Sequence, residues 1–363
     1  MAIDPGLAYG LMWVGFLAYL GALAAAPRLG RRIVWGAITF FLIGFAVAPV
    51  LLSHDVYSYV DYARLGVQHG LDPYVHPPLA APEDPAYAQV TWTEATSAYG
   101  PLFTLATYPL AWLPVGVAVA ILKAVAALSV LGIALVVSRL AAQRGVDPLR
   151  AAAFVALNPL VLVHVVGGAH NDGLTMLLAM LAVAALLSGR DLTGGAVLVA
   201  AIATKASAAF LAPFALLGSA GRSRLLLGAF GAAVAIGTAA HLAFGWDWLG
   251  GFGLAGENQD RTSYMSIPIT TARLTDLGPD AVRLTAVVLF AAAVVYLLAW
   301  TWRGGDWIRA GAWTALALLL ATAWLLPWYL IWVLPLAAIS RDRPLQLLTL
   351  SLTAYQLGAR IPL

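Results

Sequence analysis

A carboxylate stands at the start of a short polar segment, where it could move a proton at a membrane surface. Asp55 opens the run Asp-Val-Tyr-Ser-Tyr-Val-Asp-Tyr, which directly follows a long apolar stretch. A carboxylate that faces a cavity can act as a general base toward a hydroxyl. The structural alternative is an N-cap, because an aspartate at a helix start accepts backbone N–H bonds. Asp61, at the end of the same run, is a second candidate that need not share a face with Asp55.

Two cations lie where an anion could bind. Lys205 stands between two short apolar runs in Ile-Ala-Thr-Lys-Ala-Ser-Ala, where an ammonium is costly unless it faces water or an anion. A phosphate is one partner that suits a lysine, and snorkelling toward water is the alternative. Arg261, in the polar stretch 257–264, is a second phosphate candidate, with plain solvation as its alternative. Lys123 lies within an apolar run, and the sequence indicates no partner for it.

Two further polar or aromatic groups are candidates for substrate contact. His170, Asn171 and Asp172 follow a pair of glycines, which suggests close approach of a ligand to the backbone, although Asn171 or Asp172 could instead cap the next helix. His170 and Asp172 lack a second histidine cluster, so no metal site is predicted. Trp328 and Tyr329 lie in an aromatic turn over residues 324–332, which either anchors at the interface or lines a groove for a sugar or polyprenyl chain.

The composition places these residues in a membrane protein. Of 363 residues, 62% are hydrophobic and 10% charged, mean hydropathy is +0.86, and there is no cysteine. Soluble domains carry about 25% charged residues. The composition therefore excludes a soluble or disordered chain, a disulfide scaffold and cysteine chemistry. With a net charge of only +3, no nucleic-acid partner is expected. A helical polytopic protein remains, because a bilayer tolerates only backbone that satisfies its own hydrogen bonds.

Apolar runs predict one all-α domain over residues 1–363, with about twelve transmembrane helices. The first run lacks a basic flank and a cleavage site and is expected to be a retained span. The runs between residues 151 and 218 are short for a bilayer of about 30 Å, as expected for helices that line a cavity. The predicted spans are 7–26, 33–52, 115–137, 151–166, 174–188, 192–204, 206–218, 225–244, 281–301, 309–323, 329–339 and 345–358.

The loop charges predict the orientation. One alternating set of loops carries thirteen cations against four acids, and the other carries six cations against thirteen acids. By the positive-inside rule the first set is cytoplasmic, which places both termini outside. The two long loops, near 53–114 and 245–280, then lie on the outer side and are expected to form the active-site face. The expected location is the plasma membrane, with the active site on the extracytoplasmic side.

The first outer loop is predicted to carry two interfacial helices. Apolar residues recur at helical spacing from 56 to 67, which indicates an amphipathic helix along the membrane surface, and its tyrosines suit that boundary. A second helix is expected over 101–113. The acids of this loop are expected to be solvated charges; they are Glu83, Asp84 and Glu94.

Six short motifs, in order on the predicted outer side, resemble those of the GT-C superfamily of membrane glycosyltransferases. The resemblance is to its bacterial polyprenyl-phosphate-mannose-dependent mannosyltransferases. Where many relatives have a paired acid, His54 precedes Asp55 here, which leaves one carboxylate for the base. The motifs are His-Asp-Val-Tyr-Ser-Tyr at 54–59, Gly-Leu-Asp-Pro-Tyr at 70–74, Tyr-Gly-Pro-Leu at 99–102, Asn-Pro-Leu to Gly-Ala-His-Asn-Asp-Gly over 158–173, Thr-Lys at 204–205 and Leu-Pro-Trp-Tyr at 326–329.

The resemblance implies a GT-C-like bundle and an inverting transfer of a hexose, mannose above all, from a polyprenyl-phosphate donor to a glycan or glycolipid acceptor. Asp55 would be the general base, and Lys205, Arg261 and His170 would bind the donor phosphate. No cofactor or metal is expected, and the partners are the donor, the acceptor and membrane lipid. The residues implied in substrate binding are His54, Tyr57, Tyr59, Asp61, Tyr99, Asn171, Asp172, Trp328 and Tyr329.

A transporter or flippase of a lipid-linked sugar is the alternative function, because transporters also contain broken helices and polar groups at membrane depth. Such proteins place their site near the bilayer midplane between matched halves. Here the polar groups gather on one predicted face, beside large loops on that face only, which favours an enzyme. A structural subunit would not need Asp55 and Lys205 at the same surface.

Overall fold

The computed structural model describes residues 5–257, 261–264 and 266–359, and the regular structure in these ranges is entirely helical. Within these described ranges, four helices are long and apolar enough to cross a membrane, as expected for a transmembrane protein. The prediction of about twelve spans stays a prediction. The four are α1 (Pro5–Val47), α4 (Val115–Gln143), α9 (Arg222–Phe244) and α12 (Pro279–Trp302). Shorter helices include α5 (Pro148–Ala156), α6 (Asp172–Leu187), α7 (Asp191–Thr204), α13 (Trp307–Ala321) and α15 (Arg343–Ala359).

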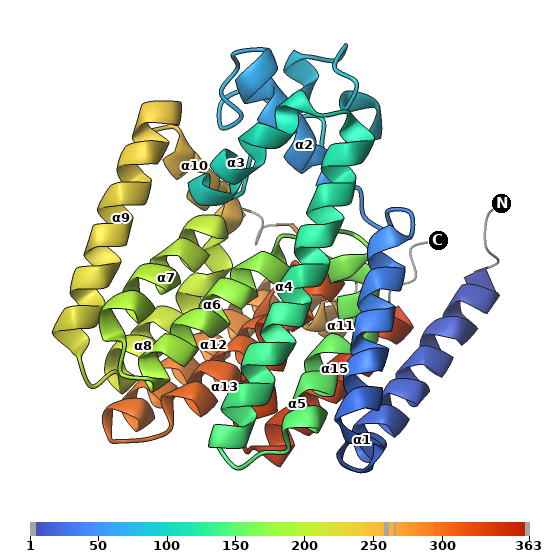
Figure 1. The fold of residues 1–363 in the computed structure, drawn as a ribbon, viewed down its shortest axis with the longest axis vertical. Helices are drawn as coiled ribbons and strands as arrows, with labels where there is room; N and C mark the ends of the chain where they lie inside the picture. Colours follow the sequence, from blue (N-terminus) through green and yellow to red (C-terminus); the bar gives the residue numbers. More distant parts are fainter. Residues whose placement is uncertain (1–4, 258–260, 265, 360–363) are drawn as a thin grey trace.

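The first helix is a hairpin of two arms that run side by side in opposite directions (Figure 1). The arms join at Gly30, whose φ of +76° and ψ of 163° interrupt the helix. Glycine adopts a positive φ at little cost because it lacks a Cβ. The arms coincide with the predicted spans 7–26 and 33–52, although the second arm ends at Val47.

Several of the short predicted spans are broken rather than continuous. Asn158 and Pro159 separate α5 from a π-helical turn, and the Asn158 side chain accepts the Leu160 N–H and donates to Thr353 Oγ1 of α15. Each break contains a proline, which cannot donate a helical hydrogen bond: Pro159 after α5, Pro213 at the start of α8 and Pro335 at the start of α14. The broken segments are η4 (Val161–Val166), η5 (Ala206–Leu211) followed by α8 (Ala212–Gly218), and η6 (Pro327–Trp332) followed by α14 (Leu334–Ile339).

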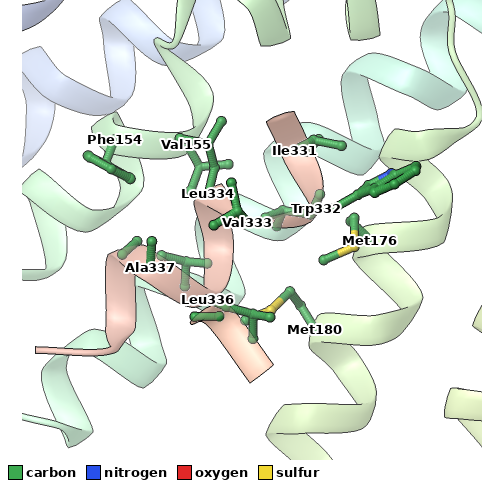
Figure 2. Close-up of a cluster of buried hydrophobic side chains, with 14 of the residues drawn as sticks. Phe154, Val155, Met176, Met180, Ile331, Trp332, Val333, Leu334, Leu336 and Ala337 are labelled. Atoms are coloured by element: carbon green, nitrogen blue, oxygen red, sulfur yellow. The ribbon is translucent and has the colours of Figure 1, made fainter. Parts of the chain in front are cut away.

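The segment 327–339 runs through the middle of the apolar core. Figure 2 shows its residues Ile331 to Ala337 between Phe154 and Val155 of α5 and the two methionines of α6. Methionine fills irregular gaps of this kind because its side chain is unbranched and flexible. This packing fixes the buried side of the turn that carries the aromatic residues of the site.

The two long loops are more structured than the sequence indicates. The predicted helix after residue 53 is confirmed as α2 (Asp55–Gln68), but every residue from Ser58 to Leu65 is buried, so the expected single apolar face is wrong. The rest of its own loop covers α2. That loop contains η1 (Pro78–Ala80), η2 (Tyr87–Gln89), α3 (Pro101–Thr107) and η3 (Tyr108–Trp112), and the second loop contains α10 (Trp248–Glu257) and α11 (Ile267–Leu274).

A buried ion pair fastens the first loop to α2. The Arg64 guanidinium donates to both carboxylate oxygens of Asp84, at 2.8 and 3.0 Å, and to the Ala111 carbonyl. His69 Nε2 lies 2.8 Å from the same carboxylate. Asp84 is 5% exposed, so its expected role as a solvated charge is wrong. The Nε–H of Arg64 is shared by both Asp84 oxygens, and a charge-assisted hydrogen bond of this kind is stronger than a neutral one. Arg64 therefore ties Asp84 and Ala111 of the first loop to α2.

Lys123 has partners that the sequence did not indicate. Its ammonium, on α4, donates to the carbonyls of Ala48 and of Pro49, the latter at 3.0 Å, just beyond the end of α1. A γ-turn centred on Leu52, with φ of +59°, follows in the same connection. The connection that leads into Asp55 is therefore fixed to α4 before α2 begins.

Candidate active site

Segments far apart in the sequence enclose a cavity of about 430 Å³. Its walls come from α2, from residues 92–99 of the first loop, from residues 205–207 after α7, from the second loop and from residues 318–332. The two loops meet where Trp248 of α10 packs with Tyr74 and Phe244. Six of the residues predicted for the site line this cavity: Asp55, Tyr99, Lys205, Arg261, Trp328 and Tyr329.

Asp55 is the first residue of α2, and its carboxylate faces the cavity rather than capping the helix. His54 occupies the N-cap position, and the indole Nε1 of Trp92 donates to Asp55 Oδ1 at 3.2 Å. The side chain is 17% exposed. Burial raises the pKa of the Asp55 carboxyl above its usual range, against the lowering effects of the Trp92 hydrogen bond and the Lys205 charge. A carboxylate whose pKa is closer to neutral is a better proton acceptor at physiological pH.

His170 lies behind the cavity wall. Its ring stacks on Trp328 at a centroid distance of 3.7 Å and an angle of 16°, and its Nδ1 is 3.7 Å from Asp55 Oδ2. Burial, together with the nearby charges of Lys205 and His164, lowers the pKa of His170 well below its usual value. A neutral, buried imidazole is a poor anion ligand, so the structure gives no support to the predicted phosphate contact of His170.

Lys205 is paired with Asp172. This pairing argues against two alternatives, snorkelling of Lys205 toward water and capping of α6 by Asp172. The Lys205 ammonium donates to Asp172 Oδ2 at 2.7 Å, and Trp332 Nε1 donates to Oδ1, also at 2.7 Å. Asp172 is fully buried at the start of α6, so it binds side chains and does not cap the helix. The ammonium also lies 5.4 Å from the ring centroid of Tyr329. Lys205 is therefore held in the cavity wall by a carboxylate and does not snorkel.

The backbone at Lys205 depends on a close approach at Gly100. Helix α7 ends at Thr204, Lys205 is extended with φ of −157°, and the Gly100 N–H donates to the Thr204 carbonyl at 3.2 Å. A Cβ at residue 100 would lie 2.1 Å from the Ala203 carbonyl oxygen, which only glycine avoids. The Tyr-Gly-Pro motif at 99–101 therefore places Tyr99 and Lys205 in adjoining parts of the wall.

Arg261 lies in the cavity wall against an aromatic ring. Its guanidinium carbon is 5.0 Å from the ring centroid of Trp92, the distance of a cation–π contact. Trp324 contacts the same indole edge-on at 6.5 Å. Trp324 and Trp332, which belong to the predicted aromatic turn, also line the cavity. Trp92 was missed in the sequence, because aromatic residues of outer loops are usual interfacial anchors.

The other predicted site residues lie outside the cavity lining. Tyr59 is buried against Tyr99 and Phe103, at centroid distances of 4.8 and 5.0 Å, and Tyr57 contacts His54. Asn171 is buried at the N-cap position of α6, without a side-chain capping bond, so its expected capping role is wrong. These residues can support the site from behind, and their direct contact with a substrate stays a prediction.

Asp61 is 1% exposed, and neither of its carboxylate oxygens has a hydrogen-bond partner among the described residues. Burial and the nearby Asp84 charge raise the pKa of Asp61 to about 7, although His69 and Arg64 act in the opposite direction. A folded-state pKa above the unfolded one means that the folded protein binds the proton more tightly. The contribution of Asp61 to the free energy of unfolding should therefore fall as the pH rises from about 4 to about 7, by up to about 4 kcal/mol.

We expect Asp61→Asn to remove this penalty, because a neutral amide does not ionise. Its melting temperature in detergent should exceed that of the wild type at pH 8, and the difference should shrink at pH 5. Asp84→Asn is the matched control, because loss of the Arg64 and His69 contacts should destabilise the protein at pH 8. Equal melting curves for Asp61→Asn and the wild type at both pH values would contradict the assignment.

Comparison with known proteins identifies the family. A family profile described as "Alpha-(1->6)-mannopyranosyltransferase, N-terminal domain" matches residues 5–221. The alpha-(1->6)-mannopyranosyltransferase A of Mycobacterium tuberculosis is 31% identical over 90% of this chain and 70% of its own length. The protein of that name in Corynebacterium glutamicum is 28% identical over 58% of this chain, and the match covers 46% of that relative. No solved structure matches the chain significantly.

The profile covers more than half of the chain, and the mycobacterial similarity extends through the second loop and the later helices. The apolar helices agree with a membrane-embedded enzyme of this kind. The chain therefore belongs to the alpha-(1->6)-mannopyranosyltransferase family, a group of GT-C-type membrane mannosyltransferases.

Proposed function

We propose that the protein transfers a mannosyl group from a polyprenyl-phosphate donor to a hydroxyl of a glycan or glycolipid acceptor, at the outer face of the plasma membrane. The observation that carries the proposal is that Asp55, Lys205 and Arg261, from three separate segments, line one cavity. One carboxylate and two cations are the groups that such a transfer needs. The predicted orientation of the two long loops supports the outer face.

Asp55 acts as the general base in this mechanism. The acceptor oxygen attacks the anomeric carbon opposite the departing phosphate, and the Asp55 carboxylate takes the acceptor proton. A single displacement inverts the anomeric centre. The relatives are named for an α-(1→6) linkage, so an inverting enzyme that forms this linkage starts from a β-linked mannosyl phosphate.

Lys205 and Arg261 stabilise the departing phosphate. It leaves as an anion and needs cations rather than a general acid. An ammonium has three hydrogens, and Lys205 donates one of them to Asp172. Lys205 can therefore still donate to the phosphate. Aromatic rings of the wall, including Trp324, Trp328 and Tyr329, can pack on the C–H faces of the sugar or on the first isoprene units.

The test is a transfer assay with purified protein in detergent, supplied with radiolabelled β-polyprenyl-phosphate mannose and an α-(1→6)-linked oligomannoside. We expect an extended product whose new linkage is cleaved by an α-mannosidase. A parallel reaction with GDP-mannose alone should give none. Product from the nucleotide sugar but not from the lipid donor would overturn the donor assignment. Movement of the lipid-linked sugar across vesicles without product would favour the flippase alternative.

A further inference from the structure

We propose that Trp92 is a positioning residue that holds the Asp55 carboxylate with its indole N–H and seats the Arg261 guanidinium on its ring face. The inference rests on the proposed function, in which Asp55 is the base and Arg261 faces the departing phosphate. In this role Trp92 positions the Asp55 carboxylate and the Arg261 guanidinium relative to each other.

The first contact fixes the carboxylate. Trp92 Nε1 donates to Asp55 Oδ1 at 3.2 Å, while Oδ2 lies 3.7 Å from His170 Nδ1, beyond hydrogen-bond distance. With Oδ1 engaged by the indole, Oδ2 is the oxygen better placed to take a proton. A base held in one orientation reacts faster because the reacting atoms are already aligned.

The second contact places the cation. The Arg261 guanidinium carbon lies 5.0 Å from the Trp92 ring centroid, and both residues line the cavity. The N–H lies in the plane of the indole and the cation lies over its face, so the two contacts do not compete for the same part of the ring. Trp92 thereby connects Arg261 of the second loop to the general base, Asp55.

The residues directly after Trp92 are held to other parts of the first loop and to α2 by three hydrogen bonds, as a positioning role requires. Tyr62 donates its hydroxyl to the Ala95 carbonyl at 2.7 Å, and the Leu79 N–H donates to the Thr93 carbonyl at 2.8 Å. The Ser97 N–H donates to the Pro73 carbonyl at 2.8 Å. A hydrogen bond from a well-held donor costs less ordering entropy when the site is formed.

The test uses Trp92→Phe, which removes the N–H and keeps a ring for Arg261. A hydrogen bond to the ionised carboxylate favours that form, so its loss should move the acid limb of the pH profile of kcat/KM upward by about one pH unit. The donor KM should change little. Trp92→Leu removes the ring as well and should shift the same limb and also raise the donor KM several-fold.

Trp324→Phe is the matched control, because its ring lines the same cavity and the Asp55 hydrogen bond comes from Trp92. Its acid limb should stay at the wild-type pH. The position of the limb does not depend on how much enzyme is folded, so reduced yield of a variant leaves the test valid. An unmoved limb in Trp92→Phe would overturn the positioning role. Asp55→Asn is assayed alongside. If the limb is unmoved in Trp92→Phe and Asp55→Asn is inactive, only the positioning role of Trp92 is wrong. If Asp55→Asn turns over normally, the proposed function is wrong.

Discussion

Asp55→Asn is expected to lower kcat for mannosyl transfer by about 10²–10⁴-fold, the usual contribution of a general base, while donor binding survives. The amide oxygen can still accept the Trp92 N–H, which now meets Oδ1 at 3.2 Å, so the local geometry should persist without a basic oxygen. Turnover would be measured with the lipid-linked donor, and donor affinity by direct binding to the purified variant.

Asp61→Asn is the matched control for this result. It makes the same chemical change on the same helix, but residue 61 is buried outside the cavity lining. Its kcat should remain close to that of the wild type. Substantial turnover by Asp55→Asn, or an equal loss in both variants, would remove Asp55 as the base.

The pH dependence of the wild type adds an independent check. Asp55 must be ionised to accept a proton, so kcat/KM should fall on the acid side, at a pH above the usual range of an aspartate because burial raises the pKa of this carboxyl. In Asp55→Asn the residual activity should lose that acid limb.

The helices could be predicted from the sequence because lipid imposes a strong and simple constraint on composition. The predicted spans 192–204 and 281–301 lie inside α7 and α12. An apolar run that must satisfy its own backbone can only be helical at membrane depth. The breaks were less predictable, because whether Asn158-Pro159 ends a helix or kinks it depends on partners such as Thr353, 195 residues away.

The side-chain partners could not be predicted. Asp84 appeared to be a solvated loop charge, and Arg64 lies 20 residues away with no local pattern that joins them. Trp92 is 37 residues from Asp55, and its role depends on how the first loop folds back over α2. Residue types and order indicated the candidate groups for chemistry, whereas tertiary packing determines which side chains hold those groups in place.

The pairing of Lys205 with Asp172 leads to the second large effect. Lys205→Met should weaken donor binding by about 30–150-fold, because a charge-assisted contact in a partly buried site is worth about 2–3 kcal/mol. The substitution should also lower the free energy of unfolding by about 3–5 kcal/mol. The Asp172 carboxylate would stay fully buried without the Lys205 ammonium, while the Trp332 N–H bond to it remains. Donor affinity and melting temperature would be measured on the same preparation.

The double variant Lys205→Met/Asp172→Asn separates the two effects. Replacing the stranded carboxylate with an amide removes the uncompensated buried charge, so the melting temperature should return toward that of the wild type. The phosphate contact is not restored, so donor affinity should stay low. If affinity returns together with stability, Lys205 is a structural partner of Asp172 and the phosphate contact is wrong. If affinity stays lost in a stable protein, the ammonium binds the donor, and Asp172 holds it at the cavity wall.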